Sequence, residues 1–501
     1  MTSDPAGDGV EPAVDYREVA ADPKAAARAT LAMVISRVIV AILGWAGSVI
    51  IARTLDAEEW GQFSFVFALL GVMSVVTDLG VGRVVLAKLI DNDPDEVART
   101  ASSFVALRTM LGGVGYLLAV GYVVVLRYPG EVITATALAG LVVVFATPSH
   151  ALSVLFQSRH RLLVVAVAES LGQVVQLALT VLAALFAPAL LIFVLPAVVN
   201  ELFKLVVKVR GVRSPALGLR PARSIGIDRW RRMLAEAVPL AIGFALTIAM
   251  MKIDVLMLSL LDTFDAVGLY SIGYKFSDMI DTISLAAVAP ISTLLVAAWP
   301  GKLDVFRERT RSAAMLFTLA GAVCVVAFWP SAGPAIRLLY GERFVEGAHA
   351  ARLLVLGAAV MSLIILGIFL LAAAEKQKYY PAVALFGLAL NIGLNLLLIP
   401  RMSYNGSAIA TVVTWGVTVV LLWLVIARTL PFDKLLPVGE LTALAALTAA
   451  ITTGATYLVD IAHSLWPVVS AGAVVLLIVL AMFFRLTGGV TIPGFRWAAR
   501  S

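Results

Sequence analysis

The sequence predicts an all-α, multi-pass membrane protein with about 14 transmembrane helices. Of its 501 residues, 61% are hydrophobic and only 14% are charged, and the mean hydropathy is +0.98. Soluble proteins carry roughly 25% charged residues, so this composition excludes an ordinary soluble fold. The apolar residues also gather into runs of about 20, which is long enough to cross a bilayer as a helix. Runs of this length must be helical, because lipid offers the backbone no hydrogen-bond partner.

The expected spans form two lobes of six and an additional C-terminal pair. They are 29–53, 61–85, 101–126, 132–157, 162–184, 188–208, 236–260, 268–299, 312–336, 351–374, 380–400, 405–427, 437–459 and 466–485. The N-terminal lobe therefore covers 29–208, the C-terminal lobe 236–428, and the thirteenth and fourteenth spans 437–486. Three polar segments are expected around them: a disordered tail at 1–28, a basic linker at 209–235 and a tail at 487–501.

The distribution of positive charge orients the chain. With both termini in the cytoplasm, the cytoplasmic segments hold 29 of the 38 Lys and Arg residues, and the outer loops hold six. The positive-inside rule favours this orientation, and we expect a multi-pass protein of the cytoplasmic (inner) membrane. The dense basic stretch at 204–232 then fits a cytoplasmic loop beside anionic lipid, so no nucleic-acid partner is expected.

An internal repeat supports the division into two lobes. "TLDAEEWGQFSF" (54–65) joins the first two spans, and "LLDTFDAVGLYSI" (260–272) joins the seventh and eighth. Both place Leu-Asp at a helix exit, acidic residues in a short outer loop, and a glycine where the next helix opens. Two parallel halves of six spans are typical of transporters.

The sequence indicates a transporter and not an enzyme. The predicted outer loops are short, and none carries HExxH, GxSxG or a phosphate-cradling Gly-Lys-Ser/Thr. The four histidines are scattered and Cys324 is the only cysteine, so we expect neither a metal site nor another cofactor. Transport against a gradient would draw on a coupling ion, H⁺ or Na⁺, or on the gradient of the substrate itself.

Charged residues inside the spans form the candidate site, beginning with "MMKIDVLMLSLL" (250–261). A charge at membrane depth costs about 2.5–3.5 kcal/mol on insertion scales, so such residues face a bundle interior or a watery cavity. We expect Lys252 and Asp254 to line a cavity. Arg37 and Lys275 are the other basic residues inside spans. Cations from both lobes, Arg37, Lys252 and Lys275, would suit an anionic headgroup such as a phosphate or diphosphate.

The acidic residues at membrane depth are candidates for gating or ion coupling: Asp78, Asp254, Asp278 and Asp281. An alternative interpretation is that they only neutralise the buried cations. Lys252 would then pair with Asp281, or Lys275 with Asp254, and the pairs would hold the helices in register.

Two arginines lie where a substrate would enter from the cytoplasm. Arg83 and Arg108, near the cytoplasmic ends of spans two and three, are candidates for meeting a lipid phosphate, or else are interfacial residues. Glu169 is expected to pair with Arg108. Asn391 and Asn395 lie one turn apart, and we expect them to hydrogen-bond another helix in preference to a sugar.

Four stretches together resemble the Wzx-type polysaccharide (oligosaccharide) flippases of the MATE-like, or MOP, exporter superfamily. They are "ARTLDAEEWGQFSFVFALLGVMSVVTDLGVGRVVLAKL" (52–89), "KIDVLMLSLLDTFDAVGLYSIGYKFSDMI" (252–280), "LLYGERFVEGAHAARLL" (338–354) and "LNIGLNLLLIPRMSYNGSAIATVV" (390–413). Each is weak alone, but the four occur in order and at the right topological positions. The resemblance therefore covers most of the chain.

The resemblance implies a two-lobed bundle that works by alternating access. A central cationic cavity would accept the diphosphate and sugars of a polyprenyl-linked oligosaccharide and move them to the outer leaflet for cell-surface polysaccharide or glycoconjugate assembly. The expected partners are this substrate, membrane lipids, and a polysaccharide polymerase or glycosyltransferases; a monomer is expected. Many members have twelve spans, and the additional pair is shared with the lipid-II flippase branch. The alternative function is a cation-coupled exporter of drugs or metabolites, whose cavity should be acidic.

Overall fold

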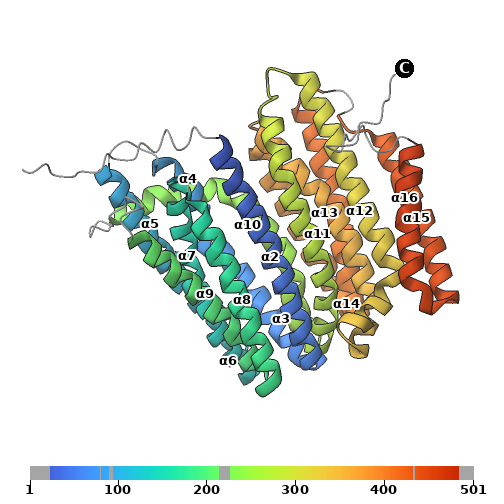
Figure 1. The fold of residues 1–501 in the computed structure, drawn as a ribbon, viewed down its shortest axis with the longest axis horizontal. Helices are drawn as coiled ribbons and strands as arrows, with labels where there is room; N and C mark the ends of the chain where they lie inside the picture. The colour runs from blue at the N-terminus through green and yellow to red at the C-terminus, as the bar shows by residue number, and fades with distance from the viewer. Residues whose placement is uncertain are drawn as a thin grey trace, which may run out of the picture.

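The structure, a computed structural model, describes residues 23–78, 80–89, 94–159, 161–213, 226–432 and 435–484. The regular elements in these residues are all helices. Two helical lobes converge at the end where α2 passes into α3 and diverge at the end where α2 begins and α16 ends (Figure 1). We call the first of these the closed end; the charge distribution predicts that it faces the outer side of the membrane.

The N-terminal lobe contains eight helices in the described residues. They are α2 (Pro23–Thr54), α3 (Ala57–Asp78), α4 (Val81–Lys88), α5 (Pro94–Val125), α6 (Gly130–Ala139), α7 (Leu141–Ser158), α8 (Leu162–Phe186) and α9 (Leu190–Arg213). Helix α2 packs along α8, while α5, α7, α9 and α8 pack in succession. Helices α6 and α7 follow each other directly at Gly140 and together form the expected fourth span.

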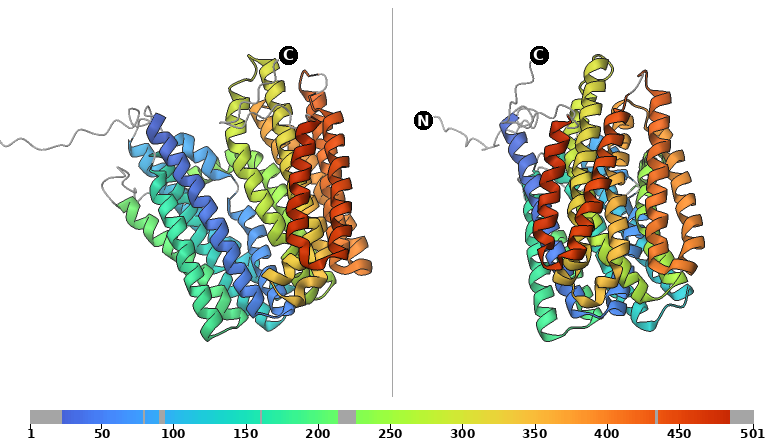
Figure 2. Two further views of the ribbon diagram at one scale, coloured as in Figure 1. Left: turned by 45° about the vertical axis from the view of Figure 1, so that its right-hand side comes forward. Right: turned by 90° about the vertical axis from the view of Figure 1, so that its right-hand side faces the viewer.

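The C-terminal lobe and the additional pair complete the bundle. Their elements are α10 (Ile227–Leu261), α11 (Phe264–Val296), α12 (Leu303–Leu339), the short 3₁₀ helices η2 (Glu342–Gly347) and η3 (Gln377–Tyr379), α13 (Ala348–Ala373), α14 (Tyr380–Thr429), α15 (Val438–Ile461), η4 (His463–Leu465) and α16 (Trp466–Phe483). Helices α15 and α16 pack against α12 at the edge of this lobe (Figure 2). They correspond to the additional pair expected from the sequence, and the division into lobes of six spans stays a prediction.

Helix α14 consists of two antiparallel helices that reverse at Ser403. The backbone there leaves the helical region, with φ 54° and ψ −140°. A Cβ built on Gly406 would lie 2.4 Å from the carbonyl oxygen of Leu398, and one built on Gly387 would lie 2.7 Å from Oγ1 of Thr418. Residues that lie nearly equal numbers of positions before and after Ser403 are therefore close in space. The two halves of α14 thus correspond to the expected eleventh and twelfth spans.

The number of spans is only partly settled. The described residues contain 11 helical segments long and apolar enough to cross a membrane, and one of them, Gln377–Thr429, includes both halves of α14. Helices α3 and α10 occupy the positions of the expected second and seventh spans but are not among these 11. The multi-pass architecture is therefore confirmed, while the count of 14 and the cytoplasmic termini stay predictions.

Helices extend into both ends of the expected linker. Helix α9 continues to Arg213 and α10 begins at Ile227, so residues 209–213 and 227–235 are helical. The start of α10 is fastened to the N-terminal lobe: Lys88 Nζ lies 2.8 Å from Glu236 Oε1, and Trp230 Nε1 donates to the carbonyl oxygen of Ser103 at 2.8 Å. Residues 214–225 of the expected linker, and most of the two expected tails, lie outside the described residues.

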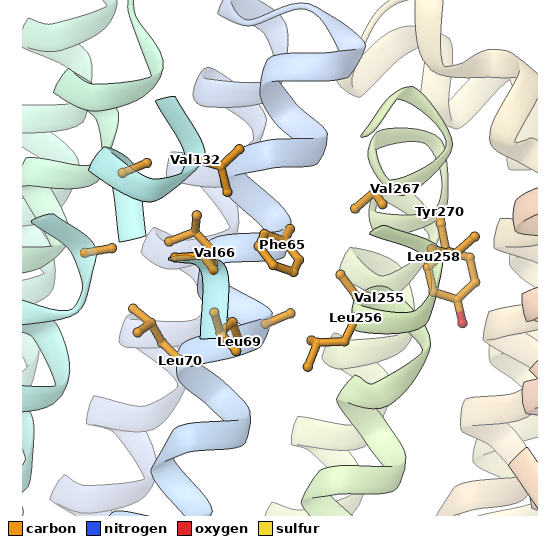
Figure 3. Packing of buried hydrophobic residues seen from close by; sticks show 14 of the residues in the cluster. Phe65, Val66, Leu69, Leu70, Val132, Val255, Leu256, Leu258, Val267 and Tyr270 are labelled. Carbon is orange, nitrogen blue, oxygen red and sulfur yellow. The ribbon is translucent and has the colours of Figure 1, made fainter. Parts of the chain in front are cut away.

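One apolar core is shared by the two lobes at the closed end. Val66 and Leu70 on α3 face Val132 of α6, while Val255 and Leu256 of α10 face α3 from the other lobe (Figure 3). The opposite ends of the lobes have separate cores, one around α4, α5 and α7 and the other around α12, α13 and α14. Burial of apolar surface between the lobes thus stabilises the closed end.

Candidate substrate cavity

A cavity of about 230 Å³ lies between the lobes, directly inside the closed end. Helices α2, α3 and α8 supply one side, and α10 and α11 supply the other. Its polar lining consists of Ser48, Ser64, Gln173, Gln176, Thr180, Ser271, Tyr274 and Lys275. Lys275 is the cation of this wall, and none of the described residues that line the cavity is acidic.

The ammonium of Lys275 is held by aromatic surface. Its Nζ lies 5.6 Å from the centroid of the Trp60 ring, which is fully buried. Among the described residues, no carboxylate lies within ion-pair distance of this ammonium. A cation–π contact stabilises the positive charge without neutralising it. Lys275 therefore remains available to an anion in the cavity, and its role as a headgroup contact stays a prediction.

The closed end is sealed by contacts across the lobes. Arg53 Nε on α2 donates to the carbonyl oxygen of Leu339 at 2.7 Å, and a second nitrogen of Arg53 donates to that of Leu338. In return Arg343 of η2 donates to the carbonyl oxygens of Leu55 at 2.8 Å and Arg53 at 2.9 Å. These bonds use the last carbonyl groups of α2 and α12, which have no partner inside their own helices.

Lys252 and Asp278 form an ion pair beside the cavity. Their nitrogen and oxygen lie 3.4 Å apart, and both side chains are partly exposed. The ammonium of Lys252 also lies 5.0 Å from the centroid of the Tyr274 ring. Asp281 lies close enough for its charge to interact with Asp278 and Lys252, but its buried Oδ1 has no hydrogen-bond partner in the described part of the chain. Of the pairings considered from sequence, Lys252 with Asp281 is thus replaced by Lys252 with Asp278.

Asp254 does not line the cavity, contrary to the expectation from sequence. Its side chain is 0% exposed and accepts hydrogen bonds from Asn395 Nδ2 (2.8 Å), Thr411 Oγ1 (2.7 Å) and the Tyr270 hydroxyl (3.0 Å). The physical reason is helical geometry: residues two apart, such as 252 and 254, point to different faces of a helix. The alternative pair of Lys275 with Asp254 is not formed.

The Asp254 cluster joins three helices of the C-terminal lobe. Asp254 belongs to α10, Tyr270 to α11, and Asn395 and Thr411 to the two halves of α14. Asn395 Nδ2 also lies 3.0 Å from Asn391 Oδ1. The expectation that these asparagines bond another helix is therefore confirmed. The amide oxygen of Asn395 and the hydroxyl of Ser407 are buried without a partner in the described residues, so the cluster retains free acceptors.

Arg37 lies on α2, exposed, and makes no hydrogen bond or ion pair within the described residues. Gly44 and Ser48, which line the cavity, follow it at positions i+7 and i+11 and therefore share its helix face. Arg37 thus lies about two turns from the cavity along the interlobe face of α2. Arg83 belongs to α4, but its side chain lies outside the described part of the structure.

Arg108 and Asp78 form an ion pair inside the N-terminal lobe. The Arg108 side chain is 3% exposed and donates to Asp78 Oδ1 at 2.7 Å and to the carbonyl oxygen of Thr77 at 2.5 Å, whereas Asp78 is 68% exposed. This burial is at odds with the expectation that Arg108 meets a lipid phosphate. The expected pair of Arg108 with Glu169 is also wrong, because Asp78 takes that place.

A buried charged network in the N-terminal lobe is absent from the sequence predictions. Lys208 is 0% exposed and lies 2.6 Å from Glu169 Oε1 and 3.0 Å from Ser149 Oγ. Lys204 lies 3.1 Å from Glu169 Oε2 and 2.8 Å from Glu201 Oε1. Both lysines belong to the basic stretch at 204–232 that is expected to be cytoplasmic, but the structure places them inside α9 and against α8.

Helical spacing carries the signal that would have found this network. Helix α8 carries polar residues at i, i+4, i+7 and i+11, namely Glu169, Gln173, Gln176 and Thr180. Helix α9 carries polar residues at i, i+4 and i+8, namely Asn200, Lys204 and Lys208. Each set lies on one helix face. Asn200 Nδ2 donates to Gln176 Oε1 at 2.5 Å and joins the two stripes. The α8 stripe runs from the charged network to the cavity.

The fold and the interlobe cavity define a multi-pass membrane transporter with two lobes. Solved structures with the same fold include the lipid II flippase MurJ in an inward closed conformation (13% identity, TM-score 0.71, 91% of this chain and 98% of that chain covered). A multidrug resistance MATE family transporter of the MOP superfamily, in an inward-facing conformation, is similar at 13% identity and TM-score 0.63 (78% and 96% covered). A third similar structure is that of a MOP superfamily transporter from Pyrococcus furiosus Vc1 (DSM3638), described as having a binding pocket of reverse polarity. It is 14% identical, with a TM-score of 0.57, and the match covers 80% of this chain and 94% of that chain.

The family assignment comes from the sequence itself. Residues 26–293, more than half of the chain, match the family described as polysaccharide biosynthesis protein, and the chain belongs to this family. The resemblance carried by the four sequence stretches is confirmed. No curated protein matches the sequence.

Proposed function

We propose that the protein is a flippase of the cytoplasmic membrane that moves a polyprenyl-diphosphate-linked oligosaccharide from the cytoplasmic to the outer leaflet by alternating access. The single observation that carries this proposal is the polarity of the interlobe cavity. Its lining combines amides and hydroxyls with Lys275, which forms no ion pair in the described residues, and none of the described lining residues is acidic. An anionic, hydroxyl-rich substrate complements such a wall.

The two ends of the bundle supply the alternating access. The contacts of Arg53 and Arg343 and the shared apolar core close the end predicted to face outward, while the lobes diverge at the opposite end (Figure 1). At about 230 Å³ the cavity is smaller than the roughly 300–1,000 Å³ of pockets for drug-sized ligands. The lobes therefore separate further to admit a whole headgroup, and the substrate then favours the conformation that fits it.

The charged residues in and beside the cavity have separate roles in substrate binding and in gating. Lys275 binds the diphosphate, with Arg37 on the same interlobe face for a substrate that arrives from the cytoplasm. The Lys252–Asp278 pair, partly exposed and only 3.4 Å apart, opens and reforms as a gate together with Asp281. Asp78 closes on Arg108 in the same way in the N-terminal lobe.

Asp254 is proposed as the coupling site for H⁺ or Na⁺. A fully buried carboxylate with no cationic partner in the described residues is costly, and a proton or a bound cation relieves that cost. The free acceptors of Asn395 and Ser407 are oxygens, the ligand type that hard cations take. Because the cluster joins α10, α11 and α14, its occupancy would change how these helices pack.

A cation-coupled exporter of drugs or metabolites is the second candidate. Its favouring observation is the MATE fold, and its substrates would be cationic. The cavity lining described above has the opposite charge, so we do not prefer this function. The flippase would act as a monomer and would deliver its product to a polymerase or to glycosyltransferases on the outer face.

Depletion of the protein tests the proposal. Lipid extracts from depleted cells should contain a polyprenyl-diphosphate oligosaccharide that accumulates on the cytoplasmic side, where an external lectin or hydrolase cannot reach it. Re-expression of the wild-type chain should remove it. A normal lipid profile together with raised sensitivity to cationic dyes would instead support the exporter and contradict the flippase.

A further inference from the structure

Gln173, on the α8 wall of the cavity, has an amide that forms no hydrogen bond in the described residues. Its side chain is 7% exposed, it lines the cavity, and it makes no hydrogen bond within the described residues. A Cβ built on Gly44 of α2 would lie 3.6 Å from Gln173 Nε2, so α2 passes within van der Waals distance of this amide. An amide that faces a cavity and bonds no protein group is available to donate to and accept from a ligand there.

Gln176, one turn further along α8, is oriented by its neighbour. Its Oε1 accepts a hydrogen bond from Asn200 Nδ2 at 2.5 Å, which leaves its own NH₂ group as a donor. The two amides lie on one face of α8 at i and i+3. Together they offer donors and one acceptor at a spacing that suits neighbouring hydroxyl groups on a single ring.

Aromatic rings and a cation complete the cavity. Phe63 and Phe67 of α3 line it, with ring centroids 4.7 Å apart, and Lys275 lies over Trp60. The apolar C–H face of a pyranose packs well on aromatic surface, while its hydroxyls bond to amides. Lys275 adds a partner for one negative charge. This set of side chains fits a sugar better than it fits a lipid tail or a metal ion.

We propose that the cavity is a subsite for one sugar ring that carries or adjoins an acidic group, and that Gln173 and Gln176 select its hydroxyl pattern. The inference rests on the proposed function and adds a substrate class and two specificity-determining residues to it. A volume of about 230 Å³ holds a single ring and not an oligosaccharide chain. The acidic group, bound by Lys275, is either the phosphate of the diphosphate that is esterified to the ring, or the carboxylate of a sugar acid, in which case Arg37 is left to bind the diphosphate.

Thermal protection of the purified protein in nanodiscs tests the subsite directly. The probes are glucose, galactose and N-acetylglucosamine, the two hexuronic acids, the three sugar 1-phosphates, and inorganic phosphate. At least one acidic sugar should raise the apparent Tm more than its neutral parent or inorganic phosphate does. The uronic acids and the 1-phosphates distinguish the two sources of negative charge.

Matched variants assign the effect to the α8 wall. Gln173→Leu and Gln176→Leu should each weaken binding of the protecting sugar about tenfold, which corresponds to about 1.4 kcal/mol. Gln157→Leu makes the same chemical change on α7 at an exposed position outside the cavity and should leave binding unchanged. Equal effects of Gln157→Leu and Gln173→Leu would overturn the proposal.

A labelling experiment makes the test independent of the sugar panel. In a Cys324→Ala background, Ser64→Cys places a thiol at the cavity wall, and Ser74→Cys places one at an exposed position on the same helix. Maleimide labelling is compared in membranes from cells that make the lipid-linked precursor and in membranes depleted of that precursor. The cysteine at 64 should react several-fold more slowly when the precursor is present. The cysteine at 74 should react at the same rate in the two kinds of membrane. Absence of protection here and in the nanodiscs overturns the subsite.

The two proposals fail in different ways. If depletion traps a lipid-linked oligosaccharide but Gln173→Leu transports it normally and without change in sugar preference, the flippase stands and the subsite is wrong. If an acidic sugar binds through Gln173 while depletion traps no lipid-linked species, the subsite stands and the flippase is wrong.

Discussion

Gly61 and Gly268 lie directly opposite each other where the two lobes meet. A Cβ built on Gly61 would lie 1.8 Å from the carbonyl oxygen of Phe264, and one built on Gly268 would lie 2.1 Å from that of Ala57. Each glycine therefore packs against the carbonyl group four residues before the other glycine. This reciprocal contact relates the two halves by an approximate two-fold axis and shows that the repeat in the sequence is also a repeat in the structure.

Replacing one of these glycines should open the closed end. In Gly268→Ala the added methyl group would meet backbone atoms of α3, which cannot rotate away as a flexible side chain can. Overpacking of this kind costs about 1–3 kcal/mol, which would shift the conformational equilibrium about 5–150-fold toward the form open at this end. Spin labels at Glu58→Cys and Glu346→Cys, in a Cys324→Ala background, should report longer distances between the lobes.

Gly113→Ala is the matched control for that experiment. Gly113 is a helical glycine on α5, and a Cβ built on it would have no neighbour within 4 Å. The same change of residue type should leave the distance distribution unaltered there. Identical distributions for Gly268→Ala and the wild type would show that the glycine contact does not govern closure.

Lys275→Gln should abolish transport without unfolding the protein. The ammonium of Lys275 contacts the Trp60 ring and forms no ion pair in the described residues, so the substitution leaves no buried carboxylate uncompensated. We expect at least a tenfold loss in delivery of lipid-linked oligosaccharide to the outer leaflet, with an apparent Tm within about 2 °C of the wild type. Lys302→Gln, at an exposed site, serves as control. A large fall in Tm would indicate a structural role instead.

Asp254 should affect stability and ion dependence separately. Asp254→Ala leaves the donors of Tyr270, Asn395 and Thr411 buried without an acceptor, each costing about 1–3 kcal/mol, so its apparent Tm should fall clearly. Asp254→Asn keeps the shape and an acceptor oxygen and should fold better, but transport should lose its response to Na⁺ or to a pH gradient. Proteoliposome transport with imposed gradients measures this, with Asp304→Asn as control. An unchanged ion response in Asp254→Asn would exclude this site.

Lys208 should be important for the stability of the N-terminal lobe. Removing one partner of a buried ion pair costs about 3–5 kcal/mol, and because Lys204 also contacts Glu169, we expect the lower end of this range for Lys208→Met. The double variant Lys208→Met/Glu169→Gln should recover part of the loss. Thermal unfolding in detergent compares both with Arg210→Met, an exposed change on the same helix. Equal stability of Lys208→Met and Arg210→Met would contradict the structural role.

The charged residues show how far sequence reasoning reaches. The cost of a charge in lipid is enough to identify Lys252, Asp254, Lys275 and Asp278 as residues of the interior. This cost does not predict which charged residues form ion pairs, because the partners belong to helices far apart in the chain. The structure pairs Lys252 with Asp278, leaves Lys275 to an aromatic ring, and surrounds Asp254 with neutral donors. Lys204 and Lys208 were assigned to a cytoplasmic stretch because local composition alone does not show which turn of a helix is buried.

The class of protein can be predicted from the sequence alone. Three local properties of the sequence carry this prediction: the apolar runs, the excess of basic residues on one side, and the repeat around Gly61 and Gly268. The apolar runs must be helices that cross the membrane, because they match the bilayer thickness and because lipid offers the backbone no hydrogen-bond partner. The position of the cavity and the side chains that line it depend on how the helices pack in three dimensions. A cavity wall consists of residues from several helices, and their rotation and register depend on packing between lobes. Gln173 and Gln176 are ordinary polar residues in the sequence, and only the approach of α2, α3 and α11 makes them part of a binding site.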